Sequence, residues 1–248
     1  EALAREGAAV TLADLDGERA QAVAAEIEEA RPGAAFGAAS DVSAEDDLRA
    51  LLGATAERLG PVDLFFANAG VAIGGGLEST EEEWERSLRV NAMAHVRAAR
   101  LLVPGWLERG EGYFVATASA AGLLTQIGNP TYAVSKHAAV AFAEWLAVTY
   151  GDRGIRVSCL CPMGVNTELL NAGFEADDAS ARISARTVAA AGAVLEPAEV
   201  AERTLEAVAE ERFLVLPHPE VLEFFRRKGA DYDRWLAGMR RLQAAVAT

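Results

Sequence analysis

The feature that most constrains this chain is the alternation of short apolar runs with longer amphipathic segments. The apolar runs are rich in β-branched or aromatic residues and are too short to be helices, which is typical of buried strands. They cover residues 9–12, 62–66, 113–116, 155–160 and 213–216. The segments between them are rich in Ala, Glu, Arg and Leu, as expected for helices. This order predicts right-handed crossovers and a parallel sheet with helices on both faces.

We therefore expect an α/β fold with a doubly wound, Rossmann-like parallel sheet in a three-layer α/β/α arrangement. The 248 residues are enough for one such domain. Residues 1–216 are expected to form its body, and residues 217–248 a helical extension of the same domain. No internal repeat, low-complexity tract or break in composition marks a second domain.

Three polar side chains are placed to begin helices. Asp16 precedes an amphipathic segment and is expected to cap it. Ser43 with Asp46 resembles a capping box for the next helix, and Thr80 with Glu83 resembles one for a third.

Charge and cysteine content exclude several classes of function. The formal net charge is −14, which argues against nucleic acid or an anionic membrane as a partner. No apolar stretch approaches the roughly 20 residues that span a bilayer, and the amino end shows no signal-peptide pattern. Cys159 and Cys161 lie two apart in an apolar run without a His/Cys cluster, so we expect buried reduced thiols and no metal site. Reduced thiols fit a cytoplasmic protein.

Candidate functional residues follow the predicted strands, because ligands of such sheets bind outside the carboxyl ends of the strands. Asn68, Ala69 and Gly70 follow the run at 62–66, and Ser119 follows the run at 113–116. The sequence Pro162-Met163-Gly164 follows the run at 155–160.

Tyr132 and Lys136 lie near the start of a predicted helix and are four residues apart, so they share one face. An ammonium group close to a phenol favours the phenolate, which would lower the pKa of Tyr132 and make it a proton shuttle. Ser119 could then hold the substrate oxygen. Such a Ser, Tyr and Lys spacing arises in about one in a thousand shuffled chains. The alternative is a core tyrosine beside a solvated helix lysine, in a chain whose only other lysine is Lys228.

Together these motifs resemble those of the short-chain dehydrogenase/reductase family, from residue 1 to about residue 216. The matching positions are Asn68-Ala69-Gly70, Asn91, Ser119, Tyr132, Lys136 and the turn from Pro162 to Thr167. The resemblance implies that residues 1–216 bind a dinucleotide and carry the catalytic site. It implies that Tyr132 is the general acid/base and that Lys136 lowers its pKa and binds the nicotinamide ribose. It also implies that Ser119 positions the reacting oxygen, and that Asn91 interrupts a helix and holds a water that relays protons to Lys136.

The resemblance further implies which residues bind the cofactor. The implied set is Asp41, Val42, Asn68, Ala69, Gly70, Pro162, Val165 and Thr167, together with Tyr132 and Lys136. Asp14 follows the run Val10-Thr11-Leu12-Ala13, at a position where a carboxylate can accept both adenosine ribose hydroxyls and would repel a 2′-phosphate. This position predicts NAD rather than NADP. The alternative for Asp14 is a helix cap, a task for which Asp16 is better placed.

Two departures from the family pattern concern the pocket and the carboxyl end. Met163 stands where the family has glycine, and Gly164 comes one place later, so Met163 is a candidate pocket residue. The usual tail is replaced by residues 217–248, which are rich in Arg and aromatic residues. They are expected to cover the pocket or to pack on a partner subunit, and we expect a homodimer or homotetramer.

The predicted pocket is largely apolar and contains no obvious Arg or Lys. It comprises Leu123, Leu124, Ile127, Met163, Leu169, Leu170 and Phe174. We therefore expect a neutral, hydrophobic secondary alcohol or ketone as the substrate. The alternatives are an epimerase or dehydratase on the same scaffold, and a nucleotide-sensing protein that has lost turnover.

Residues 1–7 resemble the end of a helix, with Gly7 as its C-terminal stop. The sequence contains no Gly-x-x-x-Gly-x-Gly turn, which would bind the pyrophosphate. We expect that turn and a central strand upstream, in roughly 15–30 further residues.

Overall fold

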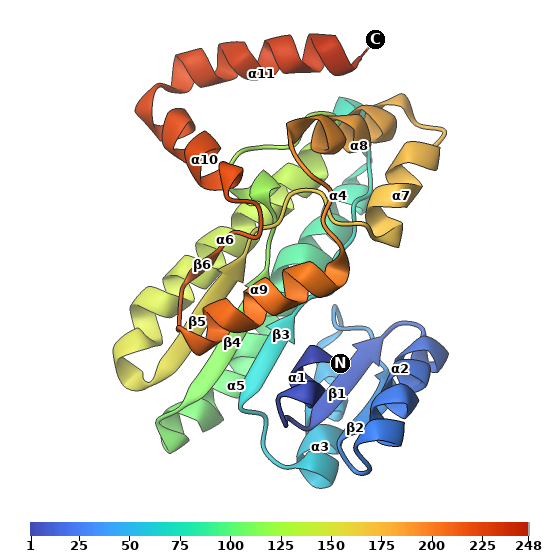
Figure 1. Ribbon diagram of the computed structural model, residues 1–248, viewed down its shortest axis with the longest axis vertical. Helices are drawn as coiled ribbons and strands as arrows, with labels where there is room; N and C mark the ends of the chain where they lie inside the picture. Colours follow the sequence, from blue (N-terminus) through green and yellow to red (C-terminus); the bar gives the residue numbers. More distant parts are fainter. Residues whose placement is uncertain (248) are drawn as a thin grey trace.

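Parallel strands alternate with helices along the chain, and the computed structural model describes residues 1–247. The strands are β1 (Val10–Asp14), β2 (Ala35–Ala39), β3 (Leu64–Ala67), β4 (Gly112–Thr117), β5 (Ile155–Leu160) and β6 (Leu214–Val215). They form two sheets, β1–β2 and β3–β4–β5–β6, and every pair is parallel. The Rossmann-like α/β fold expected from the sequence is confirmed. The edge strands β1 and β3 are not paired with each other (Figure 1). The sequence predicts a further strand between them, which stays a prediction.

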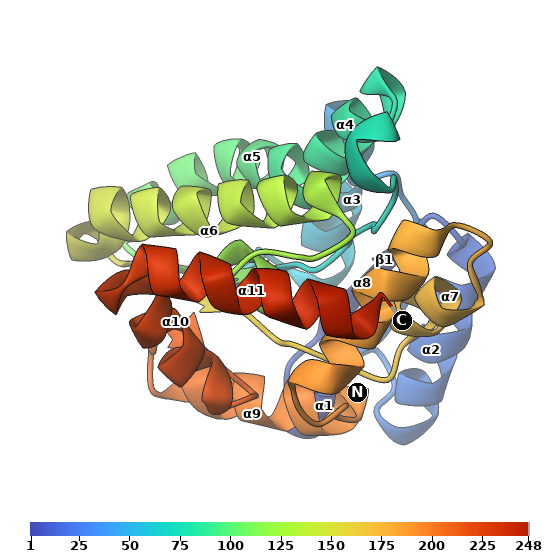
Figure 2. The ribbon, with the colours of Figure 1, turned by 90° about the horizontal axis from the view of Figure 1, so that it is seen from above.

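Helices cover both faces of the larger sheet, which gives three layers. The helices before β5 are α1 (Ala2–Arg5), α2 (Gly17–Ala30), α3 (Glu45–Leu59), α4 (Glu81–Leu88), α5 (Ala94–Arg109) and α6 (Pro130–Tyr150). The helices after β5 are α7 (Glu168–Glu175), α8 (Ala179–Ala191), α9 (Pro197–Ala209), α10 (Glu220–Ala230) and α11 (Tyr232–Val246). Figure 2 shows α5 and α6 side by side on one side of the molecule and α9 on the other.

Two predicted helix caps are confirmed. The Asp16 carboxylate accepts hydrogen bonds from two backbone N–H groups in the first turn of α2. Thr80 and Glu83 form the reciprocal capping box of α4. A cap of this kind contributes about 1 kcal/mol to stability.

The predicted capping box at Ser43 and Asp46 is wrong. Helix α3 begins after Ala44, which makes no side-chain cap. Ser43 lies in the turn after β2, where its backbone N–H donates to Asp41 Oδ1 at 2.9 Å. The Asp41 carboxylate therefore stabilises the turn that precedes α3, rather than the first turn of the helix itself.

Strand β2 was not predicted, because its sequence of Ala, Phe and Gly lacks β-branched residues. Its small side chains serve close packing instead. A Cβ on Gly37 would lie 2.4 Å from the backbone of Ala20 in α2. Helix α2 can therefore lie directly on this strand.

The main core lies between the larger sheet and α5 and α6. Its largest fully buried side chains include Trp106, Phe114, Leu146 and Ile155. Trp106 also donates its indole N–H to the Val62 carbonyl at 2.7 Å, so its polar atom is satisfied. Burial of a side chain such as Phe114 contributes about 1.5–3 kcal/mol.

The two cysteines are buried free thiols, as predicted, with their sulfur atoms 3.7 Å apart. Figure 1 shows α11 at the end of the molecule opposite to that of β1 and β2, beyond α8 and α10. Within residues 1–247, no helix combines the length and apolar character needed to cross a membrane.

Candidate active site

The first turn of α6 places Tyr132 and Lys136 on one face of the helix. The Asn129 side chain caps this helix and accepts a hydrogen bond from Tyr132 N at 2.9 Å. Pro130 follows at the first helical position, where its missing N–H costs nothing. The Lys136 ammonium lies 5.7 Å from the centroid of the Tyr132 ring. The helical spacing predicted from the sequence is therefore present.

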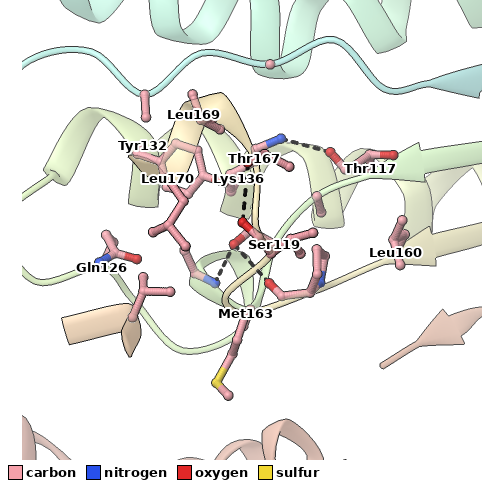
Figure 3. A pocket seen from close by; sticks show the side chains of 18 of the residues that line it. Thr117, Ser119, Gln126, Tyr132, Lys136, Leu160, Met163, Thr167, Leu169 and Leu170 are labelled. Atoms are coloured by element: carbon pink, nitrogen blue, oxygen red, sulfur yellow. Dashed lines mark hydrogen bonds between the residues drawn. The ribbon is translucent and has the colours of Figure 1, made fainter. Parts of the chain in front are cut away.

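Lys136 is buried, with an exposed fraction of 3%. Its Nζ donates to the Thr117 carbonyl oxygen at 2.8 Å, at the end of β4 (Figure 3). Burial lowers the pKa of Lys136 to about 8, and the nearby thiol group of Cys161 opposes this shift. The ammonium is thus fixed at the carboxyl end of the sheet.

Ser119 lies at the start of the short helix η3 (Ala120–Gly122), directly after β4. Its Oγ accepts a hydrogen bond from Ala121 N at 3.1 Å and donates one to the Pro162 carbonyl at 3.4 Å (Figure 3). The serine is therefore held between η3 and the turn that follows β5.

Gly122 lets η3 lie against α6. A Cβ at this position would lie 2.5 Å from the carbonyl oxygen of Lys136, closer than nonbonded atoms approach. The absence of a side chain therefore brings the Ser119 loop to the face of α6 that carries Tyr132.

The electrostatics of Tyr132 differ from the prediction. Burial raises the pKa of Tyr132, the Ser119 hydroxyl opposes this effect, and Cys161 adds to it. The sequence predicted a lowered pKa from the Lys136 ammonium. In this structure the loss of hydration is the largest influence, because it destabilises the phenolate.

Asn91 lies in a π-helical turn, η2 (Arg89–Met93), which interrupts the run from α4 to α5. Its Oδ1 accepts from Val71 N at 2.8 Å, and its Nδ2 donates to Val71 O at 2.8 Å and to Ser135 Oγ at 2.9 Å. The side chain thereby ties the segment after β3 to α6. The water that the resemblance assigns to Asn91 stays a prediction.

Gly70 lies where this segment passes the lysine. A Cβ on Gly70 would be 3.3 Å from Asn91 Oδ1 and 3.4 Å from Lys136 Nζ. A larger residue here would fill the space beside the ammonium.

The turn after β5 is held by His218. Met163 N donates to Nδ1 of this buried histidine at 3.1 Å, and Nε2 lies 3.1 Å from the Gly164 carbonyl oxygen. Nδ1 is thus the acceptor and Nε2–H the donor, which requires a neutral ring. The Pro162 carbonyl accepts from Ala120 N at 2.8 Å, so this turn is also tied to η3. The departure from the family pattern at Met163 is therefore supported by a residue beyond the last strand.

The predicted adenosine-binding residues lie at the ends of β1 and β2. Asp14 is exposed, and its Oδ1 accepts one hydrogen bond, from Asp16 N at 3.0 Å. Hydrogen bonding to the Ser43 hydroxyl is the largest cause that lowers the pKa of Asp41. Val42 is half-buried against the main core.

A cavity of about 1020 Å³ begins at the carboxyl ends of β3, β4 and β5 and extends along α9 to α1 and the start of β1. Figure 3 shows Ser119, Tyr132 and Met163 among the side chains that line it. The predicted residues that line it are Asn68, Gly70, Ser119, Leu124, Tyr132, Lys136, Pro162, Met163, Val165, Thr167, Leu169 and Leu170.

Three predicted pocket residues do not line this cavity. Leu123 and Ile127 are buried, and Leu123 packs in the main core. Phe174 is 42% exposed on α7. These three residues therefore do not belong to the pocket. Of the predicted cofactor residues, Asp14, Asp41, Val42 and Ala69 also lie outside the cavity wall, as does Asn91.

The carboxyl-terminal helices contribute cavity residues that the sequence did not identify. These are Phe224, Arg227, Trp235, Gly238, Met239 and Leu242. These helices therefore line the cavity, which agrees with one of their two predicted roles; packing on a partner subunit stays a prediction. Arg227 corrects the expectation of a wall without arginine, although its Nε is paired with Glu223 Oε1 at 2.8 Å. The aromatic and Arg-rich composition of residues 217–248 is the sequence feature that indicates a special role, but it does not indicate which surface of the fold these helices pack against.

Comparison with known proteins agrees with this geometry. A family model described as short chain dehydrogenase matches residues 1–178. A protein named inactive 2-(S)-hydroxypropyl-CoM dehydrogenase 2, from Xanthobacter autotrophicus, is 34% identical over 189 residues, which cover 76% of this chain and 80% of that protein. The 1-deoxy-11-beta-hydroxypentalenate dehydrogenase of Streptomyces exfoliatus is 36% identical, over 67% of this chain and 62% of that protein.

A solved structure agrees over a longer part of the chain. The crystal structure of a short chain dehydrogenase/reductase from Burkholderia phymatum, in complex with NAD, has a TM-score of 0.83 and 33% identity. The match covers 93% of this chain and 87% of that one. The protein therefore belongs to the short-chain dehydrogenase/reductase family of oxidoreductases.

Proposed function

We propose that the protein transfers a hydride between NAD(H) and a secondary alcohol or ketone, with Tyr132 as the general acid/base. One observation carries the proposal. Ser119, Tyr132 and Lys136 come from two separate segments and meet at the wall of one largely apolar cavity at the carboxyl end of the sheet. Polar groups that converge in such a cavity are the usual features of a catalytic site.

The residues around the cavity fit a dinucleotide. Gly70 leaves space beside the Lys136 ammonium, and Thr167 lies on the same cavity wall. Lys136 would hold the nicotinamide ribose, and Thr167 with Val165 would face the nicotinamide amide. When bound, NAD supplies the hydride acceptor and NADH the hydride donor.

The protein's own groups would orient the substrate and move one proton. The Ser119 hydroxyl would hydrogen-bond the carbonyl or hydroxyl oxygen, and the Tyr132 phenol would exchange a proton with that oxygen. The raised pKa of Tyr132 keeps the phenol protonated at neutral pH. This is the state that donates a proton to a carbonyl oxygen during reduction.

Asp14 supports NAD rather than NADP. Its exposed carboxylate ends β1 and makes one hydrogen bond, which leaves its second oxygen available for ribose hydroxyls. The helix-capping role belongs to Asp16, as described above. A 2′-phosphate beside Asp14 would place like charges together, which is unfavourable.

We further propose a neutral, hydrophobic substrate. Leu124, Met163, Leu169 and Leu170 line the cavity, and Figure 3 shows the last three near Ser119 and Tyr132. Arg227 also lines it, and its exposed guanidinium is paired with Glu223. A cytoplasmic location and a homodimer or homotetramer remain part of the proposal from the sequence.

Two alternatives remain: a nucleotide-binding protein without turnover, and an epimerase or dehydratase on the same scaffold. The printed name of the Xanthobacter relative, which includes the word inactive, makes the first worth testing. The test follows NADH absorbance with acetone, cyclohexanone, acetophenone and 2-decalone as a panel of increasing size. NADH oxidation that depends on the ketone is expected. Tight NADH binding without oxidation by any ketone would favour the alternatives.

A further inference from the structure

Only two of the 23 Lys and Arg residues of the chain are lysines, Lys136 and Lys228. Both are buried, with exposed fractions of 3% and 8%. Neither makes an ion pair with a carboxylate within residues 1–247. A buried ammonium without a counter-ion is costly, so each must be compensated in another way.

Both ammonium groups bind a backbone carbonyl of the same loop. Lys136 Nζ donates to Thr117 O at 2.8 Å, and Lys228 Nζ donates to Leu123 O at 2.7 Å. These two carbonyls flank Ser119, one at the end of β4 and the other at the end of η3. The loop that carries Ser119 is thus held at both ends by the only lysines of the chain.

Helix α10 is anchored so that Lys228 reaches this loop. Val221 is fully buried in the main core, and Phe224 packs against the same core. Lys228 follows Phe224 by four residues, so these side chains share one face of the helix. The Lys228 ammonium also lies 5.5 Å from the centroid of the Tyr232 ring, which gives it a second favourable contact.

A lysine suits the end of η3. A cation at the C-terminal end of a helical turn interacts favourably with the exposed carbonyl groups there. The compact ammonium can donate to a single carbonyl in a narrow space, whereas the planar guanidinium of arginine is larger. The arginines of the described residues are exposed or half-buried, and the two lysines are buried.

We propose that Lys228 is a positioning residue for Ser119: its bond to Leu123 O fixes η3 and so places the Ser119 hydroxyl against the substrate oxygen. The inference rests on the proposed function, because it assigns Lys228 a role in that reaction. It makes the carboxyl-terminal extension a functional part of the active site rather than only a cover.

The test is a double-mutant cycle measured with NADH and the best ketone of the panel. Lys228→Met keeps the length of the side chain and removes its donor. It should lower kcat by about tenfold in the wild-type background and leave the KM for NADH unchanged. In the Ser119→Ala background, the same change should cause no further loss, because its effect passes through the serine. Arg226→Met removes an exposed charge from the same helix and should leave kcat unchanged in both backgrounds.

Equal losses in both backgrounds, or no loss in the wild-type background, would overturn the proposal. A second measurement keeps it testable if no ketone is turned over, an outcome that would count against the proposed function alone. Amide hydrogen exchange in residues 119–123 should become faster in Lys228→Met and stay unchanged in Arg226→Met. Unchanged exchange in Lys228→Met would show that the lysine does not hold the loop. If Lys228→Met does not fold, Lys228→Gln, which keeps a donor, takes its place and should give a smaller loss of the same pattern.

Discussion

Replacement of His95 by leucine should stabilise the protein, and the gain should increase as the pH falls. His95 lies on α5 with an exposed fraction of 1%, and neither ring nitrogen has a hydrogen-bond partner within residues 1–247. Its ring meets Phe114 edge-on, with centroids 6.3 Å apart. A leucine would keep most of the apolar contact and remove two unpaired polar atoms.

The magnitude follows from burial. Burial, and to a lesser extent the Lys136 ammonium, lowers the pKa of His95 from 6.5 to about 3. Between these values the unfolded chain binds a proton that the folded protein does not, so the histidine destabilises the fold as the pH falls below 6.5. At about pH 5 this contributes about 2 kcal/mol in favour of the leucine variant. At about pH 7.5 only the relief of the unpaired nitrogens remains, which is about 1–3 kcal/mol for each nitrogen before the loss of contact with Phe114 is subtracted.

The assay is urea unfolding of wild type and His95→Leu at both pH values, followed by tryptophan fluorescence. The difference in the free energy of unfolding should be larger at the lower pH. His137→Leu is the matched control, because it removes an exposed histidine from the neighbouring helix α6. A difference for His95→Leu that is the same at both pH values would refute the reasoning from burial.

Three further predictions concern the cofactor, the turn after β5 and the pocket. The wild type should prefer NAD over NADP by at least about tenfold in kcat/KM. Asp14→Ala should reduce this ratio, mainly because it weakens the binding of NAD. A wild type that prefers NADP would contradict the role of Asp14. His218→Leu leaves the Met163 N–H and the Ala193 carbonyl without their partner. Urea unfolding should show that the free energy of unfolding falls by about 2–6 kcal/mol. A decrease below about 1 kcal/mol would show that these hydrogen bonds contribute little to stability. Across neutral ketones of increasing size, kcat/KM should rise, since each buried CH₂ contributes about 0.8 kcal/mol; a preference for carboxylated or phosphorylated substrates would contradict a neutral pocket.

Local patterns in the sequence predicted much of the fold and the spacing of the candidate catalytic residues. The apolar runs at β4 and β5, the cap at Asp16 and the spacing of Tyr132 and Lys136 depend on nearby residues, and the structure contains them. Strand β2 was missed because its small residues are chosen for packing against α2 rather than for strand propensity.

Features that depend on distant contacts could not be predicted. The sequence assigns no role to His218 or Lys228, because their partners, Met163 and Leu123, lie far away along the chain. The assignment of Leu123 to the pocket failed for a similar reason. Its place in the core depends on how η3 packs, which no local pattern specifies.

The central claim is that Tyr132 moves the proton in a hydride-transfer reaction. Tyr132→Phe removes only the phenolic oxygen, so the fold and cofactor binding should be retained, as checked by circular dichroism and NADH fluorescence. With the best ketone and NADH, kcat should fall by at least about 10²–10⁴, the range for a lost acid/base group. A Tyr132→Phe variant that oxidises NADH at a rate close to the wild type would contradict the mechanism.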